Sequence, residues 1–249
     1  TILNSFQPDK VMNLAAETHV DRSIENSDKF ISSNIVGTHN LLKEVTKYWK
    51  KLKGRKKNNF RFHQVSTDEV YGDLKINDNP FNEMSSYKPS SPYSASKASS
   101  DHLVSAWYRT YGLPILISYS SNNYGPMQHP EKLIPKIIFN AINGKKIPIY
   151  GNGKQIRDWI YVEDHVNALF KIIKKGKVGE KYNIGSSNEM TNIGITNKIC
   201  KYLELKFKKM GKNKKFINLI TYVDDRLGHD FRYAINSNKI KKKIGWKSK

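Results

Sequence analysis

The sequence is poor in cysteine, in acidic residues and in long apolar runs, and each shortage excludes a class of protein. The single cysteine, Cys200, has no partner within the chain, which excludes an internal disulfide and predicts a protein of the reducing cytoplasm. No apolar run approaches the roughly 18 residues of a membrane span. The 22 acidic residues are outnumbered by 43 Lys and Arg, which gives a formal net charge of +21 at pH 7.

The excess of positive charge is compatible with a nucleic-acid or membrane partner, but its distribution favours a simpler interpretation. Only seven of the basic residues are Arg, and the Lys-rich runs 50–57, 206–215 and 239–243 fall where we expect loops or helix ends. We interpret these runs as solvated surface and expect no nucleic-acid and no membrane partner. A basic binding module remains the alternative from a different class, and salt-dependent retention on DNA would favour it.

The 249 residues suffice for one large domain, or for one domain with a smaller lobe. In the first half, apolar runs predict strands over 11–16, 60–66 and 115–119, and helical spacing predicts helices over 27–48 and 94–111. Strands that alternate with helices imply right-handed crossovers and a parallel sheet. The expected fold class is therefore α/β, with a Rossmann-like doubly wound parallel sheet.

Beyond residue 130 the pattern changes, and we expect a smaller α/β lobe there. Helices are expected over 133–143, 162–173, 192–205 and 237–244, strands over 147–150, 182–185 and 216–222, loops over 50–59 and 76–92, and a turn over 122–126. We expect a partial Rossmann-like domain with the catalytic residues at 1–125. The smaller lobe is expected at 126–249, with 158–185 returning to the first domain.

The segment 66–72 has the sequence Ser-Thr-Asp-Glu-Val-Tyr-Gly and follows an expected strand. In open parallel sheets, ligands bind at the carboxyl ends of the strands. Adjacent carboxyls such as Asp68 and Glu69 commonly cap a helix or face solvent. Because they stand beside Thr67 at a strand end, we interpret them instead as an acid and a base with pKa values driven apart.

Tyr93 and Lys97 are four residues apart on an expected helix, so they share one face. Tyr-x-x-x-Lys is short, and alone it is more often an exposed helix pair. Here it follows a strand that ends in Thr-Asp-Glu, which favours a functional role. A phenol has an ordinary pKa of about 10. The ammonium of Lys97 and a cationic nicotinamide ring would stabilise the phenolate, so Tyr93 is a candidate base.

Together these motifs resemble the dTDP-glucose 4,6-dehydratases, a family of extended short-chain dehydrogenase/reductases among the NAD-dependent sugar epimerases and dehydratases. The resemblance extends over nearly the whole chain, in the family's order and spacing. The matching blocks are 14–23, 66–72, 92–97, 121–126, 130–135, 148–151, 155–159 and 226–230. The paired acids distinguish the chain from sugar 4-epimerases, which resemble it elsewhere but lack them.

The resemblance implies an NAD-dependent hydro-lyase that converts dTDP-glucose to dTDP-4-keto-6-deoxyglucose and water, in deoxysugar (rhamnose-type) biosynthesis. In this reaction Tyr93, helped by Thr67 and Lys97, takes the proton of the sugar 4-hydroxyl. The family then uses Glu69 to remove the C5 proton and Asp68 to protonate the departing C6 hydroxyl. Hydride that leaves C4 returns to C6, so NAD is not consumed and no metal is needed.

The resemblance implies that 1–125 is a partial NAD-binding domain and that 126–249 is mainly a nucleotide-sugar-binding lobe. It also implies two sets of binding residues. NAD would contact Leu14, Ala15, Ala16, Thr18, Ser33, Tyr93, Lys97 and Asn123. The nucleotide sugar would contact Thr18, Thr67, Asn122, Lys132, Leu133, Pro148, Ile149, Tyr150, Arg157, Asn192, Asp225, Arg226, Leu227, Gly228 and His229. Arg157 and Arg226 suit a pyrophosphate because guanidinium is planar and bidentate, although each could instead form a surface salt bridge. Leu227 replaces the family's usual Pro, which loosens its loop.

The family's Gly-rich dinucleotide fingerprint and its acidic ribose partner are missing from this sequence. The family carries both before the position that corresponds to Thr1. We therefore expect a fragment with an open sheet edge at 11–16, which alone binds NAD weakly and aggregates. At full length we expect a homodimer. The alternative activities are a UDP-glucose 4,6-dehydratase or a related sugar epimerase or decarboxylase, and an inactive fragment is the remaining possibility.

Overall fold

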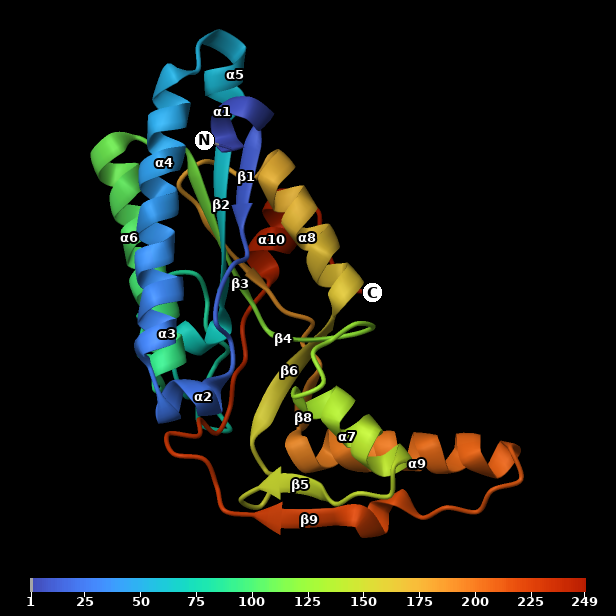
Figure 1. Cartoon of the computed structure of the whole chain (residues 1–249). Coiled ribbons are helices and arrows are strands. Elements are labelled where there is room, and N and C mark those ends of the chain that lie inside the picture. The colour runs from blue at the N-terminus through green and yellow to red at the C-terminus, as the bar shows by residue number, and fades with distance from the viewer. Residues whose placement is uncertain (1) are drawn as a thin grey trace.

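The structure is a computed structural model that describes residues 2–249, and Thr1 lies outside the described residues. A parallel sheet of four strands, in the order β1-β2-β3-β7, forms the upper part of the molecule in Figure 1. Its strands are β1 (Lys10–Asn13), β2 (Arg61–Thr67), β3 (Ile115–Ser120) and β7 (Lys181–Ile184). Each neighbouring pair in this sheet runs parallel, so all four carboxyl ends meet at one edge.

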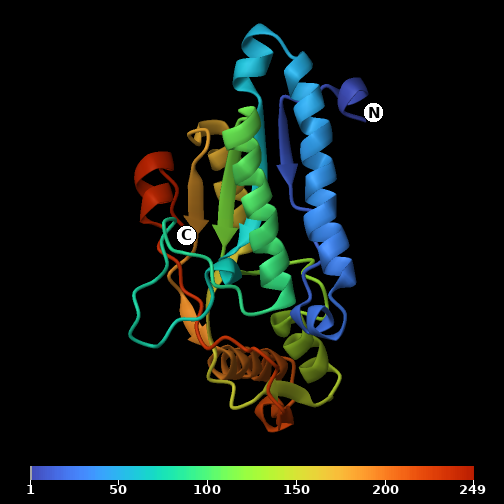
Figure 2. The ribbon, with the colours of Figure 1, turned by 90° about the vertical axis from the view of Figure 1, so that its left-hand side faces the viewer.

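Helices cover both faces of this sheet, as Figures 1 and 2 show. One face carries a long continuous helix, formed by α3 (Asp28–Phe30), the π-helical segment η1 (Ile31–Val36) and α4 (Gly37–Lys51). Helix α6 (Pro92–Tyr111) lies on the same face. The other face carries α8 (Val162–Lys175) and α10 (Asn238–Ile244). Along β3, Ile115 and Ile117 pack into the first core, whereas Leu116 packs into the second, as the two-residue period of a strand requires. The predicted Rossmann-like α/β fold class is confirmed.

The lower part of the molecule has its own apolar core and its own elements. They are α7 (Leu133–Ile142), β5 (Ile147–Tyr150), α9 (Asn192–Lys209), the 3-10 turn η3 (Phe216–Leu219) and β9 (Ile220–Val223), with β5 and β9 paired in parallel. A small sheet joins the two parts; its strands are β4 (Asn122–Tyr124), β6 (Ile156–Tyr161) and β8 (Glu189–Thr191). The remaining elements are α1 (Ile2–Phe6), α2 (Val20–Glu25), α5 (Gly54–Asn59) and the 3-10 turn η2 (Asp68–Tyr71).

Several expected elements differ in type or length from those in the structure. The first expected strand ends at Asn13 rather than residue 16, because β2 pairs only with Lys10 through Asn13. The expected turn at 122–126 contains strand β4, which pairs with the distant β6. The expected loop 50–59 contains helix α5, which has no buried residue and therefore no apolar pattern to predict it. Pairing between distant segments decided the first two differences.

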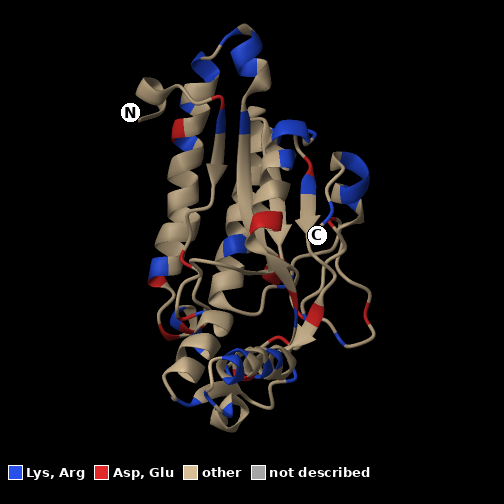
Figure 3. Ribbon diagram, turned by 90° about the vertical axis from the view of Figure 1, so that its right-hand side faces the viewer, with Lys and Arg blue, Asp and Glu red and all other residues tan. Residues whose placement is uncertain are grey.

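The basic residues are spread over the periphery in Figure 3. The Lys-rich runs lie on the end of α4 and on α5, on the last turn of α9 and the segment that follows it, and on α10. Within residues 2–249, no helix combines the length and apolar character needed to cross a membrane.

Candidate active site

The end of β2 places two carboxyl groups at the ligand-binding edge of the sheet. Thr67 is extended, and its Oγ1 accepts a hydrogen bond from the backbone N–H of Glu69 (3.3 Å), which starts η2 at once. The turn ends at Gly72, whose φ of 89° favours glycine. A Cβ there would stand 2.2 Å from the backbone oxygen of Lys88. The sequence Thr-Asp-Glu-Val-Tyr-Gly is therefore a tight turn that presents Asp68 and Glu69.

The two carboxyls differ in their surroundings. Asp68 is 2% exposed, and its Oδ2 has no hydrogen-bond partner among the described residues. Burial raises the pKa of Asp68 well above its ordinary value, and the carboxyls of Glu69 and Asp158 raise it further. Burial also raises the pKa of Glu69, but three cations oppose this rise; they are Arg157, Arg226 and Lys132. Asp68 therefore holds its proton more strongly than Glu69.

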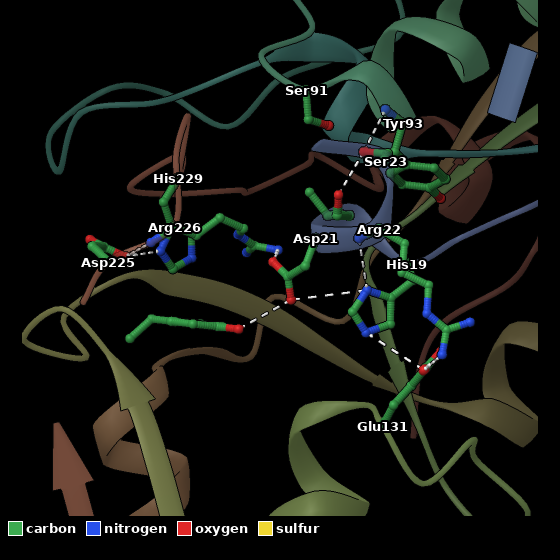
Figure 4. A network of polar contacts seen from close by, with 12 residues as sticks. His19, Asp21, Arg22, Ser23, Ser91, Tyr93, Glu131, Asp225, Arg226 and His229 are labelled. Atoms are coloured by element: carbon green, nitrogen blue, oxygen red, sulfur yellow. Dashed lines mark hydrogen bonds and ion pairs between the residues drawn. The ribbon is translucent and has the colours of Figure 1, made fainter. Parts of the chain in front are cut away.

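Tyr93 enters the site from the first turn of α6. Ser91 caps this helix through a capping box with Ser94, and Pro92 occupies the first turn. The ring of Tyr93 packs edge-to-face on Phe30 at 6.3 Å, and its backbone N–H donates to Ser23 Oγ (3.2 Å), as Figure 4 shows. Helix α6 thus begins at a defined residue, and contacts from α2 and α3 hold Tyr93 in place.

Burial sets the charge state of Tyr93 and Lys97 in the protein alone. Burial raises the pKa of Tyr93 above its ordinary value, as does the charge of Glu69, while a hydrogen bond with Thr67 opposes both. Lys97 is 5% exposed and donates from Nζ to the backbone oxygen of Val65 (2.8 Å). Burial lowers its pKa. Tyr93 is therefore a neutral phenol, and the expected effect of Lys97 does not by itself make it a phenolate.

Beyond β1, the chain presents small and apolar side chains at the same edge. Leu14 is 57% exposed, and Ala15 and Ala16 follow it. Asn34 fixes the next residue, because its Oδ1 accepts from the backbone N–H of Glu17 (2.8 Å) and its Nδ2 donates to the backbone oxygen of Glu17 (3.1 Å). This exposed apolar segment could pack against a flat ring.

Buried amide oxygens without partners lie near the end of β3. Among the described residues, Oδ1 of Asn122 and Oδ1 of Asn123 are buried and have no hydrogen-bond partner. Asn123 donates from Nδ2 to the backbone oxygen of Ser121 (3.1 Å). The exposed apolar segment and these free acceptors together fit a dinucleotide such as NAD and a hydroxyl-rich sugar. Ser33, also expected to contact NAD, is exposed on η1.

A network of charged side chains borders the site (Figure 4), and Asp21 on α2 is at its centre. Tyr150 at the end of β5 donates its hydroxyl to Asp21 Oδ2 (3.2 Å), and Arg226 Nη1 lies 3.4 Å from Asp21 Oδ1. Lys132 donates from Nζ to the backbone oxygen of Thr18 (2.8 Å). These contacts join four segments that are far apart in the sequence.

The two expected pyrophosphate-binding arginines are held in different ways. Arg157 is buried; its Nη2 donates to the backbone oxygen of Asp230 (2.9 Å), and its guanidinium stacks on the ring of Tyr233 at 4.2 Å. Arg226 is half-buried and forms an ion pair with Asp21. Arg157 therefore supports the loop that follows residue 224, whereas Arg226 presents its charge at the edge of the site.

The loop 225–229 is fixed at its two ends. His229 Nδ1 lies 2.6 Å from Asp225 Oδ1, and Gln155 donates to Asp225 Oδ2 (3.0 Å). Gly228 has a φ of 61°, and a Cβ there would stand 3.1 Å from the backbone oxygen of Ser90. Leu227 is 77% exposed.

The remaining expected substrate contacts lie in the lower part of the molecule. Ile149 is 2% exposed and Leu133 packs against the same core, so their backbone atoms rather than their side chains are available to a ligand. Pro148 is half-buried, and Asn192 begins α9 with its backbone N–H bound to the oxygen of Gln155 (2.9 Å).

Sequence reasoning missed three residues that organise the site. Asn34 holds the segment after β1, Asp21 holds Arg226, and Asp101 is completely buried on α6. A signal existed only for Asp101, which lies four residues after Lys97 and eight after Tyr93, on the same helix face.

A parallel α/β sheet with a Tyr-Lys pair and two adjacent acids at its carboxyl edge defines a sugar-nucleotide dehydratase of the short-chain dehydrogenase type. Residues 1–249 match the GDP-mannose 4,6 dehydratase family, so the chain belongs to this family.

Within the family, the similar curated proteins are dTDP-glucose 4,6-dehydratases. The enzyme of Haemophilus influenzae is 55% identical over 246 residues, which cover 98% of this chain and 73% of that protein. One from Escherichia coli is 58% identical over 254 residues, with 98% and 70% covered. A crystal structure of the Streptomyces venezuelae enzyme with NAD bound superposes with a TM-score of 0.85 at 37% identity, covering 98% of this chain and 69% of that one. The resemblance predicted from the motifs is confirmed.

Proposed function

We propose that this chain catalyses the NAD-dependent conversion of dTDP-glucose to dTDP-4-keto-6-deoxyglucose and water. The observation that carries the proposal is the pair Asp68 and Glu69, two adjacent carboxyls with different electrostatic surroundings. A reaction that adds a proton to one sugar atom and removes one from another needs such a pair. The similar proteins of known activity bear the same enzyme name.

NAD supplies the hydride acceptor for C4 of the sugar and the hydride donor for C6. We assign its nicotinamide half to the exposed segment Leu14, Ala15 and Ala16, with Asn123 nearby. These residues fit a flat ring because they are small or apolar and because the buried oxygen of Asn123 is free to accept a hydrogen bond.

Tyr93 is proposed as the base for the sugar 4-hydroxyl. In the protein alone its pKa is raised, mainly by burial, so the phenol needs additional positive charge before it can accept a proton. Lys97 lies one helical turn away and contributes part of this charge. Thr67 accepts or donates at the phenol oxygen and keeps it directed toward the site. The proton from the 4-hydroxyl thus moves to the oxygen of Tyr93.

Glu69 is proposed as the base for C5–H, and Asp68 as the acid for the C6 hydroxyl. Burial raises the pKa of Asp68 and so favours its protonated form, which can donate to a departing hydroxyl. Arg157, Arg226 and Lys132 favour the ionised form of Glu69, so it can accept a proton. Loss of the C5 proton and of the protonated C6 hydroxyl releases one water. The surroundings of the two groups thus support the roles that the family resemblance implies.

The nucleoside diphosphate is proposed to lie along the charged border of the site. Lys132 and Arg226 carry positive charge there, and the polar loop 225–229 and the backbone of β5 flank it. We place the NAD-binding domain at 1–125 and the nucleotide-sugar lobe at 126–249, with 158–185 in the first domain. We also propose a cytoplasmic location, because the single cysteine, Cys200, is reduced and buried.

The test is a product assay with dTDP-glucose and NAD, with UDP-glucose in parallel. The readout is the alkali-induced absorbance of a 4-keto-6-deoxy sugar. Because weak NAD binding is expected, NAD is supplied in large excess. We then expect product from dTDP-glucose with the unchanged protein, and none with the double variant Asp68→Asn, Glu69→Gln. Glu131→Gln is the matched control, because Glu131 is a carboxyl outside the acid–base pair. Product from the double variant contradicts the proposed roles, and binding of the nucleotide sugar without product contradicts the proposed activity.

A further inference from the structure

Helix α6 carries a third polar side chain on its catalytic face. Tyr93, Lys97 and Asp101 are each one turn apart, and they meet three successive residues at the end of β2. The side chain of Thr67 lowers the pKa of Tyr93, and Lys97 donates to the backbone oxygen of Val65 (2.8 Å). Asp101 accepts on Oδ2 from the hydroxyl of Ser66 (2.6 Å). The three pairs connect the helix to the strand that carries the paired acids.

Asp101 is completely buried, and only one of its oxygens is satisfied. Its exposed fraction is 0%, and Oδ1 has no hydrogen-bond partner within residues 2–249. An ionised carboxylate at such a position is costly unless a positive charge is nearby. The groups that face it are two cations, Lys97 on α6 and Lys181 on β7, and the phenols Tyr71, Tyr87, Tyr93 and Tyr119. A buried carboxyl flanked by two lysines is suited to balance their charge.

Lys97 is a buried cation that also lacks a charged hydrogen-bond partner. It is 5% exposed, and its hydrogen-bond acceptor, the backbone oxygen of Val65, is neutral. A buried ammonium without a counter-charge loses its proton readily. Burial lowers the pKa of Lys97, and the charge of Asp101 raises it. Among residues 2–249, Asp101 is the anion whose charge raises the pKa of Lys97.

We propose that Asp101 is a positioning residue that keeps Lys97 charged beside Tyr93, with Ser66 orienting its carboxylate. Asp101 acts through the field across one helical turn, where the Cβ atoms of residues four apart are about 5–6 Å from each other. At an effective dielectric constant of about 20, this field moves the midpoint of Lys97 titration by about two pH units.

The inference rests on the proposed function only for the importance of Lys97, because the charge of Lys97 can be measured without activity. The protein is labelled with ¹³C at lysine Cε, and the Lys97 resonance is assigned by its loss in Lys97→Arg. A titration from neutral to alkaline pH then gives its midpoint. We expect Asp101→Asn to lower this midpoint by about two pH units. Asp164→Asn, which removes a buried carboxyl on α8, is the matched control and leaves it unchanged.

The same experiment contains the results that overturn the proposal. If Asp101→Asn folds and the Lys97 midpoint is unchanged, Asp101 has only a structural role and the proposal is wrong. If this variant does not fold, the titration of Asp101 in the unchanged protein tests the proposal instead. The pKa of Asp101 is about 7, so the Lys97 resonance must shift in step with the ¹³Cγ resonance of Asp101. A Lys97 chemical shift that does not change as Asp101 titrates contradicts the proposal.

Activity provides the second readout. We expect the alkaline limb of the kcat profile of Asp101→Asn to move toward neutral pH, with KM for the sugar nucleotide unchanged. Asp101→Glu restores a carboxylate and should return the limb toward its original position. If the protein forms no product but the Lys97 midpoint responds to Asp101, the proposed function fails while this inference stands.

Discussion

The active site combines two regions that handle charge in different ways. We call the first the catalytic corner; it consists of Thr67, Asp68, Glu69, Tyr93, Lys97 and Asp101. We call the second the rim; it consists of His19, Asp21, Glu131, Lys132, Tyr150 and Arg226. In the catalytic corner the titratable groups are mostly buried, and burial is the largest influence on each shifted pKa. In the rim, His19 pairs with Glu131 and Arg226 pairs with Asp21, and all four side chains are partly exposed.

This difference indicates how each region works. Buried groups can exchange roles as acid or base when one proton or one ligand charge changes, because water does not screen them. Paired groups at an exposed border attract and orient an anion, but salt and water weaken each pair. The catalytic corner therefore suits proton transfer, and the rim suits recognition of a diphosphate.

The largest effect should come from the catalytic corner. Replacing the base by Glu69→Gln removes proton transfer at C5, so we expect kcat to fall by about 10²–10⁴-fold. The measurement is product formation, together with exchange of the sugar C5 proton with deuterium from solvent, which should stop. Glu131→Gln, a rim carboxyl, should lower kcat far less. Equal losses in the two variants would remove the distinction between the regions.

Burial should control charge elsewhere in the chain as well. His63 and His165 are buried on strand β2 and helix α8, and burial lowers their pKa values to about 3 and about 4. In the unfolded chain a histidine takes up its proton near pH 6.5. The unfolded state therefore binds more protons below that pH, and these histidines destabilise the fold as the pH falls toward their folded pKa values.

The variant His165→Asn isolates this contribution. The buried carboxyls Asp68 and Asp101 act in the opposite direction, because their raised pKa values let the folded state bind more protons. The useful quantity is therefore the difference in free energy of unfolding between His165→Asn and the unchanged protein. We expect it to move in favour of the variant by about 3 kcal/mol between pH 7 and pH 4. Urea unfolding at several pH values measures it, and a pH-independent difference would contradict the burial argument.

Arg226 tests the rim directly. Arg226→Gln removes a half-buried cation at the border of the site, so we expect KM for the nucleotide sugar to rise about tenfold, with a smaller change in kcat. Added salt should reduce the difference, because it screens the charge that the variant lacks. The measurement is initial rate against substrate concentration at low and high salt. A large fall in kcat with unchanged KM would place Arg226 in the catalytic corner instead.

The smallest effect is expected for the exposed ion pair between Arg22 and the rim residue Glu131. Arg22 Nη2 lies 2.7 Å from Glu131, but the side chain of Arg22 is 62% exposed. Such pairs contribute about 0–1 kcal/mol. Arg22→Ala should therefore leave the melting temperature almost unchanged, as calorimetry would show. A loss comparable to that of a buried group would mean that the rim is a rigid part of the fold.

The sequence predicted the α/β class because its apolar periods are local and regular. It failed where distant pairing decides: β4 forms only against β6, and β1 stops where β2 no longer pairs with it. Helix α5 was missed because none of its residues is buried. The sequence therefore predicted the elements that depend on nearby residues and missed those that depend on pairing between distant segments.

The catalytic residue types were also readable from the chain. Thr67, Asp68 and Glu69 follow a strand, and Tyr93 and Lys97 share a helix face, so their spacing along the chain already suggested a site. The different surroundings of Arg157 and Arg226 could not be predicted from the sequence. The guanidinium of Arg157 donates to the backbone oxygen of Asp230. Arg226 pairs with Asp21, which lies 205 residues earlier in the sequence.

By itself, then, the sequence determined the order of elements, the fold class and the set of reactive side chains, because each depends on neighbours a few residues apart. Only the tertiary structure decided which of those side chains are charged. The pKa of a carboxyl, phenol or ammonium depends on how much water reaches it and on which charges surround it. Helix α6, which carries Tyr93, Lys97 and Asp101, packs against β2, β3 and α2, and only folding brings these segments together.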